Sequence, residues 1–178
     1  MEHTFDHLII GAGMAGAAAA VALRQADGQA SIALLGAEAH PPYDRPPLSK
    51  ALWKDGKEDD IWRPIQDARA TVQLRRRAVA IDRAAHTVRD DAGDRCHYRK
   101  LLLATGGAPR TLPFGPDFIY LRTLDDYQRL RQAAQPGTRA VVIGGGFIGS
   151  EIAAALTLNG AAVTMLFPEG AIGARAYP

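Results

Sequence analysis

A Gly-x-Gly-x-x-Gly turn that occurs twice, at residues 11–16 and 144–149, constrains the fold of this chain more than any other feature. The first turn follows the apolar run Leu8–Ile10 and opens an alanine-rich stretch of good helix formers. A second apolar run, Ser31–Leu35, comes after the expected helix. The first 36 residues are therefore predicted to form a βαβ unit with a parallel sheet.

Each glycine of such a turn has its own physical role. The first permits a tight turn, the second lets the backbone approach a pyrophosphate, and the third lets helix and strand pack closely. The helix start adds N–H groups and a positive dipole end, so a phosphate needs no lysine there. The predicted phosphate contacts of the first turn are Gly11, Gly13, Ala15 and Gly16.

The second turn stands between the apolar run Ala140–Ile143 and the helical pattern Phe147–Leu158. Two such units in one chain predict two dinucleotides. The predicted contacts of the second turn are Gly144, Gly146, Ile148 and Gly149.

Glu169 follows the expected strand Ala162–Phe167, about 20 residues beyond Gly149, where an acidic side chain commonly meets the adenosine ribose. Its charge would repel a 2′-phosphate, which favours NADH over NADPH. The alternative is that Glu169 is a solvated loop residue.

The segment between the two units has a different pattern. Short apolar runs from Thr71 to Lys100 predict an antiparallel insert, and Leu101–Ala104 predicts a buried strand that ends against a ligand or another backbone. Asp125–Gln132 predicts a surface helix before the second unit. The fold class is therefore α/β, with a Rossmann-like domain that carries an antiparallel insert, followed by the first half of a second Rossmann-like domain.

Composition excludes several classes of function. The net charge of +2 is spread along the chain, so nucleic acid is not an expected partner. No apolar run reaches the roughly 20 residues of a membrane-spanning helix. Cys96 is the single cysteine, which excludes an internal disulfide and a Cys-x-x-Cys pair and favours a cytoplasmic location. The histidines have no ligand-like spacing, and no metal is expected.

Three motifs together resemble a known family. They are the first glycine turn, the stretch from Pro42 to Trp53 (Pro-Tyr-Asp-Arg-Pro-Pro-Leu-Ser-Lys-Ala-Leu-Trp), and Ala-Thr-Gly-Gly-Ala-Pro-Arg at residues 104–110. This combination resembles the FAD-dependent pyridine nucleotide-disulfide oxidoreductases, in the branch of ferredoxin and rubredoxin reductases that includes apoptosis-inducing factor. The resemblance implies an FAD-binding domain over 1–115 and part of an NAD(P)-binding domain over 116–178.

The resemblance also implies roles for matching positions. It places Arg45 near the FAD pyrophosphate, Lys50 near the flavin ring, and the Ala78 backbone beside the adenine. It places Thr105, Gly106 and Arg110 beside the cofactor, and Phe147 and Glu151 where the nicotinamide of NADH meets the flavin. The charges of Arg45 and Lys50 fit these roles, because a guanidinium binds phosphate well and a cation near the flavin stabilises its reduced state. Lys50, Phe147 and Glu151 are thus the expected catalytic residues.

One position departs from the family pattern. The family usually has an acid six positions before the loop tyrosine, where it binds the FAD ribose, and this chain has Ala37 there. Glu38 is next, and is expected to take over the ribose by a small shift of the loop.

The function implied is hydride transfer from NADH to FAD and onward electron transfer to an iron–sulfur carrier of the ferredoxin or rubredoxin type. The alternatives are an apoptosis-inducing-factor-like NADH oxidoreductase, favoured by the stretch Leu-Phe-Pro-Glu-Gly at residues 166–170, and a non-catalytic nucleotide-binding module. A disulfide reductase is set aside because Cys96 is alone. The chain is expected to be an amino-terminal fragment, incomplete as an enzyme, of a protein that can form a homodimer in its full-length form.

Overall fold

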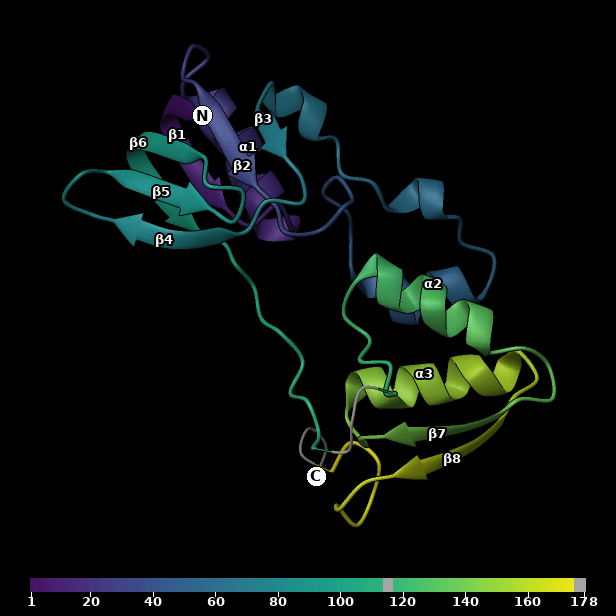
Figure 1. Cartoon of the computed structure of the whole chain (residues 1–178). Helices are drawn as coiled ribbons and strands as arrows, with labels where there is room; N and C mark the ends of the chain where they lie inside the picture. The colour runs from purple at the N-terminus through teal and green to yellow at the C-terminus, as the bar shows by residue number, and fades with distance from the viewer. Residues whose placement is uncertain (114–116, 175–178) are drawn as a thin grey trace. The chain divides into compact units, whose positions relative to one another are not determined.

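A computed structural model describes residues 1–113 and 117–174 of the chain. They form two compact units (Figure 1). The first combines Met1–Asp44 with Ile61–Ala108, and the second combines Arg45–Asp60 with the chain from Pro109 onward. The expected domain boundary between residues 115 and 116 lies outside the described residues and stays a prediction.

The first unit contains a six-stranded sheet in the order β3-β2-β1-β6-β5-β4. Its strands are β1 (Glu2–Ile10), β2 (Ile32–Leu35), β3 (Thr71–Gln73), β4 (Ala78–Asp82), β5 (Thr87–Asp90) and β6 (Arg95–Leu103). Helix α1 (Met14–Ala26) connects β1 to β2, which pair in parallel as predicted. The 3₁₀ turn η4 (Ile65–Ala68) belongs to this unit, whereas η1 (Pro46–Ser49) and η2 (Ala51–Trp53) belong to the second, and η3 (Glu58–Ile61) ends where the chain re-enters the first.

Two expectations for the insert were wrong. Strand β3 belongs to the parallel part of the sheet, because Ala33 and Leu34 pair with Thr71 and Val72. Only β4, β5 and the beginning of β6 form the antiparallel insert. The end of the expected insert, up to Lys100, and the separately expected strand from Leu101 form the single strand β6 (Arg95–Leu103), because it pairs with β1 along the length of both strands.

The core of the first unit lies on both faces of β1 and β2, because successive side chains of a strand point to opposite faces. One face carries Ile9, Ile32 and Leu34, which pack with Ala20 of α1 and with Ala68. The opposite face packs against strands of the insert and is formed by Leu8, Ile10, Ala33, Leu35, Val88 and Cys96. The parallel strands are therefore covered on both sides, by α1 and by the antiparallel insert.

The second unit contains α2 (Leu124–Ala133), β7 (Arg139–Ile143), α3 (Phe147–Leu158) and β8 (Ala162–Leu166). Strands β7 and β8 pair in parallel, and α3 connects them, so the second βαβ unit forms as predicted. Helix α2 begins with a capping box in which Thr123 and Asp126 bond to each other's backbone N–H groups.

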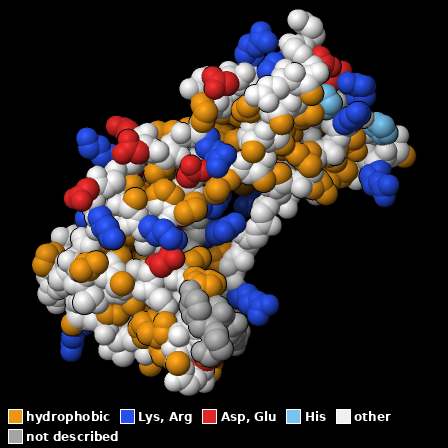
Figure 2. Space-filling view, turned by 180° about the vertical axis from the view of Figure 1, so that it is seen from behind, with side chains coloured by type: hydrophobic (Ala, Val, Ile, Leu, Met, Phe, Trp, Pro, Cys, Tyr) orange, Lys and Arg blue, Asp and Glu red, His pale blue; other side chains and the backbone are white. Residues whose placement is uncertain are grey.

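Several apolar side chains of the strands are exposed. Leu103 of β6 is 59% exposed, so the expectation that 101–104 is a buried strand holds only in part. In the second unit, Val141, Ile143 and Leu166 are exposed on one face of β7 and β8, while α3 buries Ile152 and Leu156. Figure 2 shows apolar, basic and acidic side chains interspersed on the face in view. No helix in the described part of the chain is long and apolar enough to cross a membrane.

Candidate functional site

The first glycine turn lies between the end of β1 and the start of α1. Gly11 has a φ of +116°, and a Cβ there would overlap the carbonyl oxygen of Ala104. A Cβ on Gly16 would overlap the carbonyl oxygen of Gly11. The first and third glycines are thus required by the turn and by close packing, as the sequence predicts. Gly13 is the N-cap of α1.

The carboxyl ends of three parallel strands meet beside this turn. Ile10 pairs with Leu35 of β2 and with Leu103 of β6, and the Ala104 N–H donates to the Ile10 carbonyl at 2.8 Å. Thr105 and Gly106 follow immediately and are exposed. The structure therefore brings five of the predicted FAD contacts to one edge of the sheet: Gly11, Gly13, Ala15, Thr105 and Gly106.

Glu38 follows β2 at the same edge. Its Oε2 accepts a hydrogen bond from the hydroxyl of Tyr43, which is buried. The Glu38 carbonyl accepts from the Arg75 N–H at 3.0 Å, so the segment that leads to Ala78 and β4 runs alongside. The predicted ribose contact therefore lies beside the chain segment that leads to the predicted adenine contact in the first unit.

The second turn repeats the geometry of the first. A Cβ on Gly149 would overlap the Gly144 carbonyl oxygen, the counterpart of the contact of Gly16 with Gly11. Gly146 is the N-cap of α3, and a Cβ there would meet no described atom within 4 Å. Phe147 and Ile148 lie exposed on the first turn of α3. The backbone at Gly146 is therefore open to a ligand.

The two units also agree in the position of an acidic residue. Glu38 is the third residue beyond Leu35, the last of β2, and Glu169 is the third beyond Leu166, the last of β8. Both are half-buried. This internal match supports Glu38 rather than Ala37 as the counterpart of Glu169.

The amino-terminal ends of α1 and α3 differ from that of α2 in features that favour anion binding. Among the described residues, no side chain caps α1 or α3, and neither helix has an acidic residue in its first turn. Helix α2, in contrast, has its capping box and two acids in its first turn. The amide groups and dipole ends of α1 and α3 therefore suit a pyrophosphate, which fits FAD at the first turn and NADH at the second.

The chain between Arg45 and Asp60 brings a cation to α3. Lys50 follows η1, and its Nζ lies 2.8 Å from Oε2 of Glu151. The hydroxyl of Ser49 donates to the same oxygen at 2.6 Å. Lys50 and Glu151, predicted separately from the resemblance, are therefore in direct contact although they are 101 residues apart in the sequence.

These contacts set the charge of Glu151. Partial burial raises the pKa of this carboxyl, but hydrogen bonds from Lys50 and Ser49, together with the charge of Lys50, outweigh it and hold the pKa below its usual value. Glu151 is therefore ionised at neutral pH.

Two other predicted cations also belong to the second unit. Arg45 donates from Nη1 to the carbonyl of Arg122 at 2.8 Å, and Arg110 is exposed on the chain that follows β6. The predicted contacts at the first turn, and Glu38 and Ala78, belong to the first unit. Their roles toward a cofactor stay predictions.

Sequence reasoning missed how the segment that carries Lys50 is held. Trp53 is buried and donates from Nε1 to the Leu48 carbonyl, while Tyr127 of α2 donates to the Leu52 carbonyl. Asn159, after α3, donates to the Trp53 carbonyl. A large aromatic residue next to the Pro-Pro-Leu-Ser-Lys run was the available signal, because such side chains are seldom left exposed.

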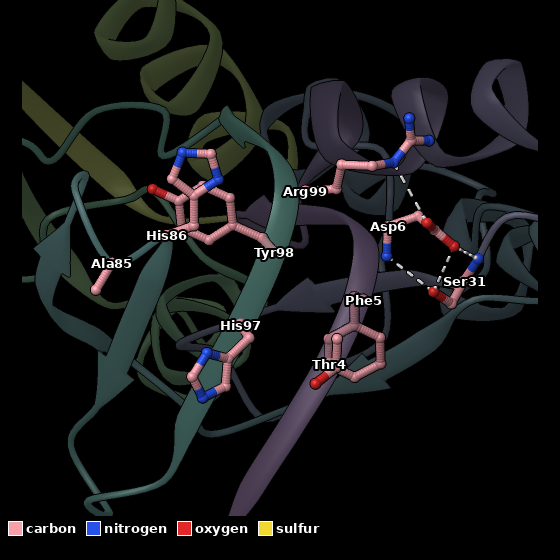
Figure 3. A pocket seen from close by; sticks show the side chains of 9 residues that line it. All are labelled: Thr4, Phe5, Asp6, Ser31, Ala85, His86, His97, Tyr98 and Arg99. Atoms are coloured by element: carbon pink, nitrogen blue, oxygen red, sulfur yellow. Dashed lines mark hydrogen bonds and ion pairs between the residues drawn. The ribbon is translucent and has the colours of Figure 1, made fainter.

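A shallow pocket of the first unit lies along the amino-terminal halves of β1 and β6, away from the glycine turn (Figure 3). Its lining includes His86 stacked on Tyr98, with ring centres 5.3 Å apart. Asp6 is already bonded to Ser31 and Arg99. Asp6 and Arg99, which line this pocket, thus bond to each other, and we assign the pocket no role.

Cys96 lies in the core of the first unit. Burial, followed by the charges of Asp90 and Asp94, raises the pKa of its thiol. A buried, protonated thiol is a poor nucleophile, which argues against redox chemistry at this residue. The described residues contain no cluster of three or more His, Cys, Asp or Glu side chains that could hold a metal ion.

Comparison with known proteins gives a family match over nearly the whole chain. The family model described as pyridine nucleotide-disulphide oxidoreductase matches residues 5–177. The ferredoxin–NAD(+) reductase component of the anthranilate 1,2-dioxygenase system of Burkholderia cepacia is 42% identical over 182 residues, covering 96% of this chain and 44% of the relative. Putidaredoxin reductase CamA of Pseudomonas putida is 36% identical, covering 89% of this chain and 40% of the relative.

Solved structures agree with these matches. The ferredoxin reductase of the CYP199A2 system from Rhodopseudomonas palustris superimposes with a TM-score of 0.88 at 39% identity, over 97% of this chain and 45% of that one. The covalent putidaredoxin reductase–putidaredoxin complex contains a chain with a TM-score of 0.87 at 31% identity, over 98% of this chain and 45% of that one. The present chain thus spans less than half the length of these relatives.

Proposed function

The chain belongs to the pyridine nucleotide-disulphide oxidoreductase family, and on that premise we propose that it carries the FAD-binding and NADH-binding segments of a ferredoxin reductase. The electron acceptor proposed is an iron–sulfur carrier of the ferredoxin or rubredoxin type. The names of the relatives support this choice, because they include reductase components of dioxygenase systems and a putidaredoxin reductase. They also favour it over the apoptosis-inducing-factor-like alternative.

The observation that carries the proposal is the repeated helix start. Two βαβ units each offer a helix with a glycine N-cap, no acid in its first turn, and a glutamate three residues beyond the second strand. In the first unit, the FAD pyrophosphate binds at residues 11–16 and Glu38 accepts hydrogen bonds from the ribose. In the second, NADH binds at residues 144–149 with Glu169 on its ribose.

When bound, FAD supplies the ability to accept a hydride from NADH and to release its electrons singly to the carrier. The chain supplies orientation and charge. Lys50 provides the cation that favours the reduced cofactor, and Glu151 keeps the Lys50 ammonium in place through their contact. The Phe147 ring, exposed on the first turn of α3, would contact the nicotinamide and help to orient it. No side chain acts as a nucleophile.

Two further proposals concern the whole protein. A cytoplasmic location is supported by the single, buried cysteine, since secreted proteins of this size commonly carry disulfides. A homodimer of a longer form follows from the resemblance alone and is tested by light scattering.

Flavin binding is the direct test of the first turn. FAD is titrated into the 178-residue chain and into any longer form that contains it, and binding is followed by quenching of flavin fluorescence. Gly13→Val is expected to weaken binding by roughly tenfold or more, because its side chain would block the approach of the pyrophosphate. Gly28→Val is the matched control, since a Cβ at Gly28 meets no described atom within 4 Å. Unchanged affinity in a folded Gly13→Val variant contradicts the assignment.

Reduction of the flavin distinguishes the enzyme from a non-catalytic module. NADH is added without air, and the visible flavin band is followed in the form that retains FAD. Bleaching followed by transfer to a ferredoxin supports the proposed function. Binding of NADH by a protein that takes up no FAD supports the non-catalytic alternative.

A further inference from the structure

Ser49 contacts Glu151, and this contact has no part in the function proposed above. Its side chain is buried, and its hydroxyl lies 2.6 Å from Oε2 of Glu151, which stands 102 residues later in the sequence. The same oxygen accepts from Nζ of Lys50 at 2.8 Å. One carboxylate oxygen thus receives hydrogen bonds from two consecutive residues of the chain.

The backbone around Ser49 is well held. The Lys50 N–H donates to the Pro47 carbonyl at 3.0 Å and closes η1, in which two prolines restrict φ. The indole of Trp53 donates to the carbonyl of Leu48 at 2.8 Å. The position of the Ser49 hydroxyl is therefore determined by the turn rather than by a long flexible side chain.

The hydroxyl of Ser49 has one proton to donate. The Pro46 carbonyl is 3.5 Å away and the Glu151 oxygen is 2.6 Å away, so the proton goes to the carboxylate. A hydrogen bond to a charged acceptor is about twice as strong as a neutral one.

Ser49 and Lys50 differ in how firmly they hold this carboxylate. The Lys50 side chain is 55% exposed, while that of Glu151 is 28% exposed. An exposed lysine on four rotatable carbons is loosely placed, and its ammonium can meet either oxygen of a carboxylate. The buried Ser49 hydroxyl, on a short side chain, faces Oε2 of Glu151 at 2.6 Å. Lys50 thus provides a positive charge beside the Glu151 carboxylate, and Ser49 fixes the orientation of that carboxylate.

We propose that Ser49 is a positioning residue that orients the Glu151 carboxylate and keeps it ionised, so that the Lys50 ammonium is held by a fixed partner. The effect on the redox reaction rests on the proposed function, whereas the effect on Glu151 itself does not. Partial burial raises the pKa of Glu151, and the hydrogen bonds from Lys50 and Ser49 lower it, which agrees with this role.

The test is a titration of Glu151 by carbon-13 NMR of the side-chain carboxyl in the full 178-residue chain labelled at glutamate. The resonance is identified as the one that Glu151→Gln removes. Ser49→Ala is expected to shift the titration midpoint upward, and Ser49→Cys is expected to do the same with a side chain of similar size that is a weak donor. Ser49→Thr keeps a hydroxyl and is expected to retain the wild-type midpoint.

The matched control is Ser31→Ala, which removes a hydroxyl that donates to the Asp6 carboxylate at 2.8 Å in the first unit. It is expected to leave the Glu151 midpoint unchanged. Lys50→Met is measured beside it and raises the midpoint by loss of charge. A midpoint that is unchanged in both Ser49→Ala and Ser49→Cys overturns the proposal, and so does an equal shift in Ser49→Thr. If Ser49→Ala does not fold, the Cys and Thr variants decide.

A second measurement separates this inference from the proposed function. In a form that retains FAD, Ser49→Ala is expected to displace the acid limb of flavin reduction by NADH toward higher pH, and Ser49→Thr is expected to restore it. If NADH fails to reduce the flavin of the unaltered protein, the proposed function fails. The positioning of Glu151 then still stands or falls on the NMR titration alone.

Discussion

The Arg131 guanidinium lies over the Trp53 ring, 5.0 Å from its centre. Tyr127 meets the same ring edge to face, with ring centres 5.7 Å apart. Arg131 also donates to the Asn159 side chain at 2.6 Å, and Asn159 in turn donates to the Trp53 carbonyl. The segment that carries Lys50 is therefore joined to both helices of the second unit.

Removing the indole is expected to weaken this unit strongly. Trp53→Ala deletes a buried ring and should lower the free energy of unfolding by about 3–5 kcal/mol. Arg131→Met keeps much of the stem but loses the cation, and should cost about 1 kcal/mol. Urea denaturation followed by far-UV circular dichroism measures both. Trp62→Ala is the control, because Trp62 is 36% exposed in the first unit, and an equal loss there would contradict the role of Trp53.

The two glycines of the second turn are expected to respond differently to a side chain. Gly146→Val should leave folding intact, since its Cβ faces open space among the described atoms, but should weaken NADH binding by roughly tenfold or more. Gly149→Val should destabilise the unit itself, because its Cβ would overlap the carbonyl oxygen of Gly144. Calorimetric titration with NADH and thermal unfolding separate the two effects. Full NADH affinity in Gly146→Val would exclude this turn as the binding site.

Asp6 and Ser31 predict how stability changes with acid. The Ser31 N–H and hydroxyl, with a smaller contribution from Arg99, hold the pKa of Asp6 below its usual value despite some desolvation. A carboxyl with a lowered folded-state pKa adds stability above its unfolded pKa, and this is lost as the pH falls through the folded value. Ser31→Ala should therefore be less stable than wild type near about pH 7, and the difference should shrink as the pH falls below the unfolded value of about 4. Urea unfolding at several pH values measures this, and a difference that persists in acid would contradict it.

The local parts of the fold were predictable because their signals are local. A glycine turn between an apolar run and a helical pattern predicts strand, turn and helix, and both units form in this way. The continuity of β6 was not predictable, because the polar stretch before Leu101 is typical of a hairpin edge. Pairing with β1, which is distant in the sequence, decided the outcome.

The residues of the candidate site were predictable from local motifs, but the contacts between them were not. Lys50 and Glu151 could be named from motifs, but neither motif contains their contact, which joins parts of the chain 101 residues apart. Ser49 lies inside the same motif as Lys50, but its residue type does not indicate a contact with Glu151, since a serine in a turn commonly makes local hydrogen bonds. Trp53 at the end of this motif signals a buried aromatic residue, but the sequence pattern does not indicate that it packs against Tyr127 of α2.

Glu169 is expected to set the preference between the two nicotinamide cofactors. It stands three residues beyond β8, as Glu38 stands beyond β2, and from there a carboxylate can accept hydrogen bonds from both ribose hydroxyls. A 2′-phosphate would instead meet a like charge. Glu169→Ala should weaken NADH binding until the affinities for NADH and NADPH are similar. The ratio of the two dissociation constants should change by roughly tenfold or more. Glu169→Gln retains an acceptor and should lose the discrimination while keeping more of the NADH affinity. Calorimetric titration with each nucleotide measures both constants, with Glu2→Ala as a control because Glu2 begins β1 in the first unit. A ratio that does not change in either Glu169 variant would mean that this residue is only a solvated part of the loop.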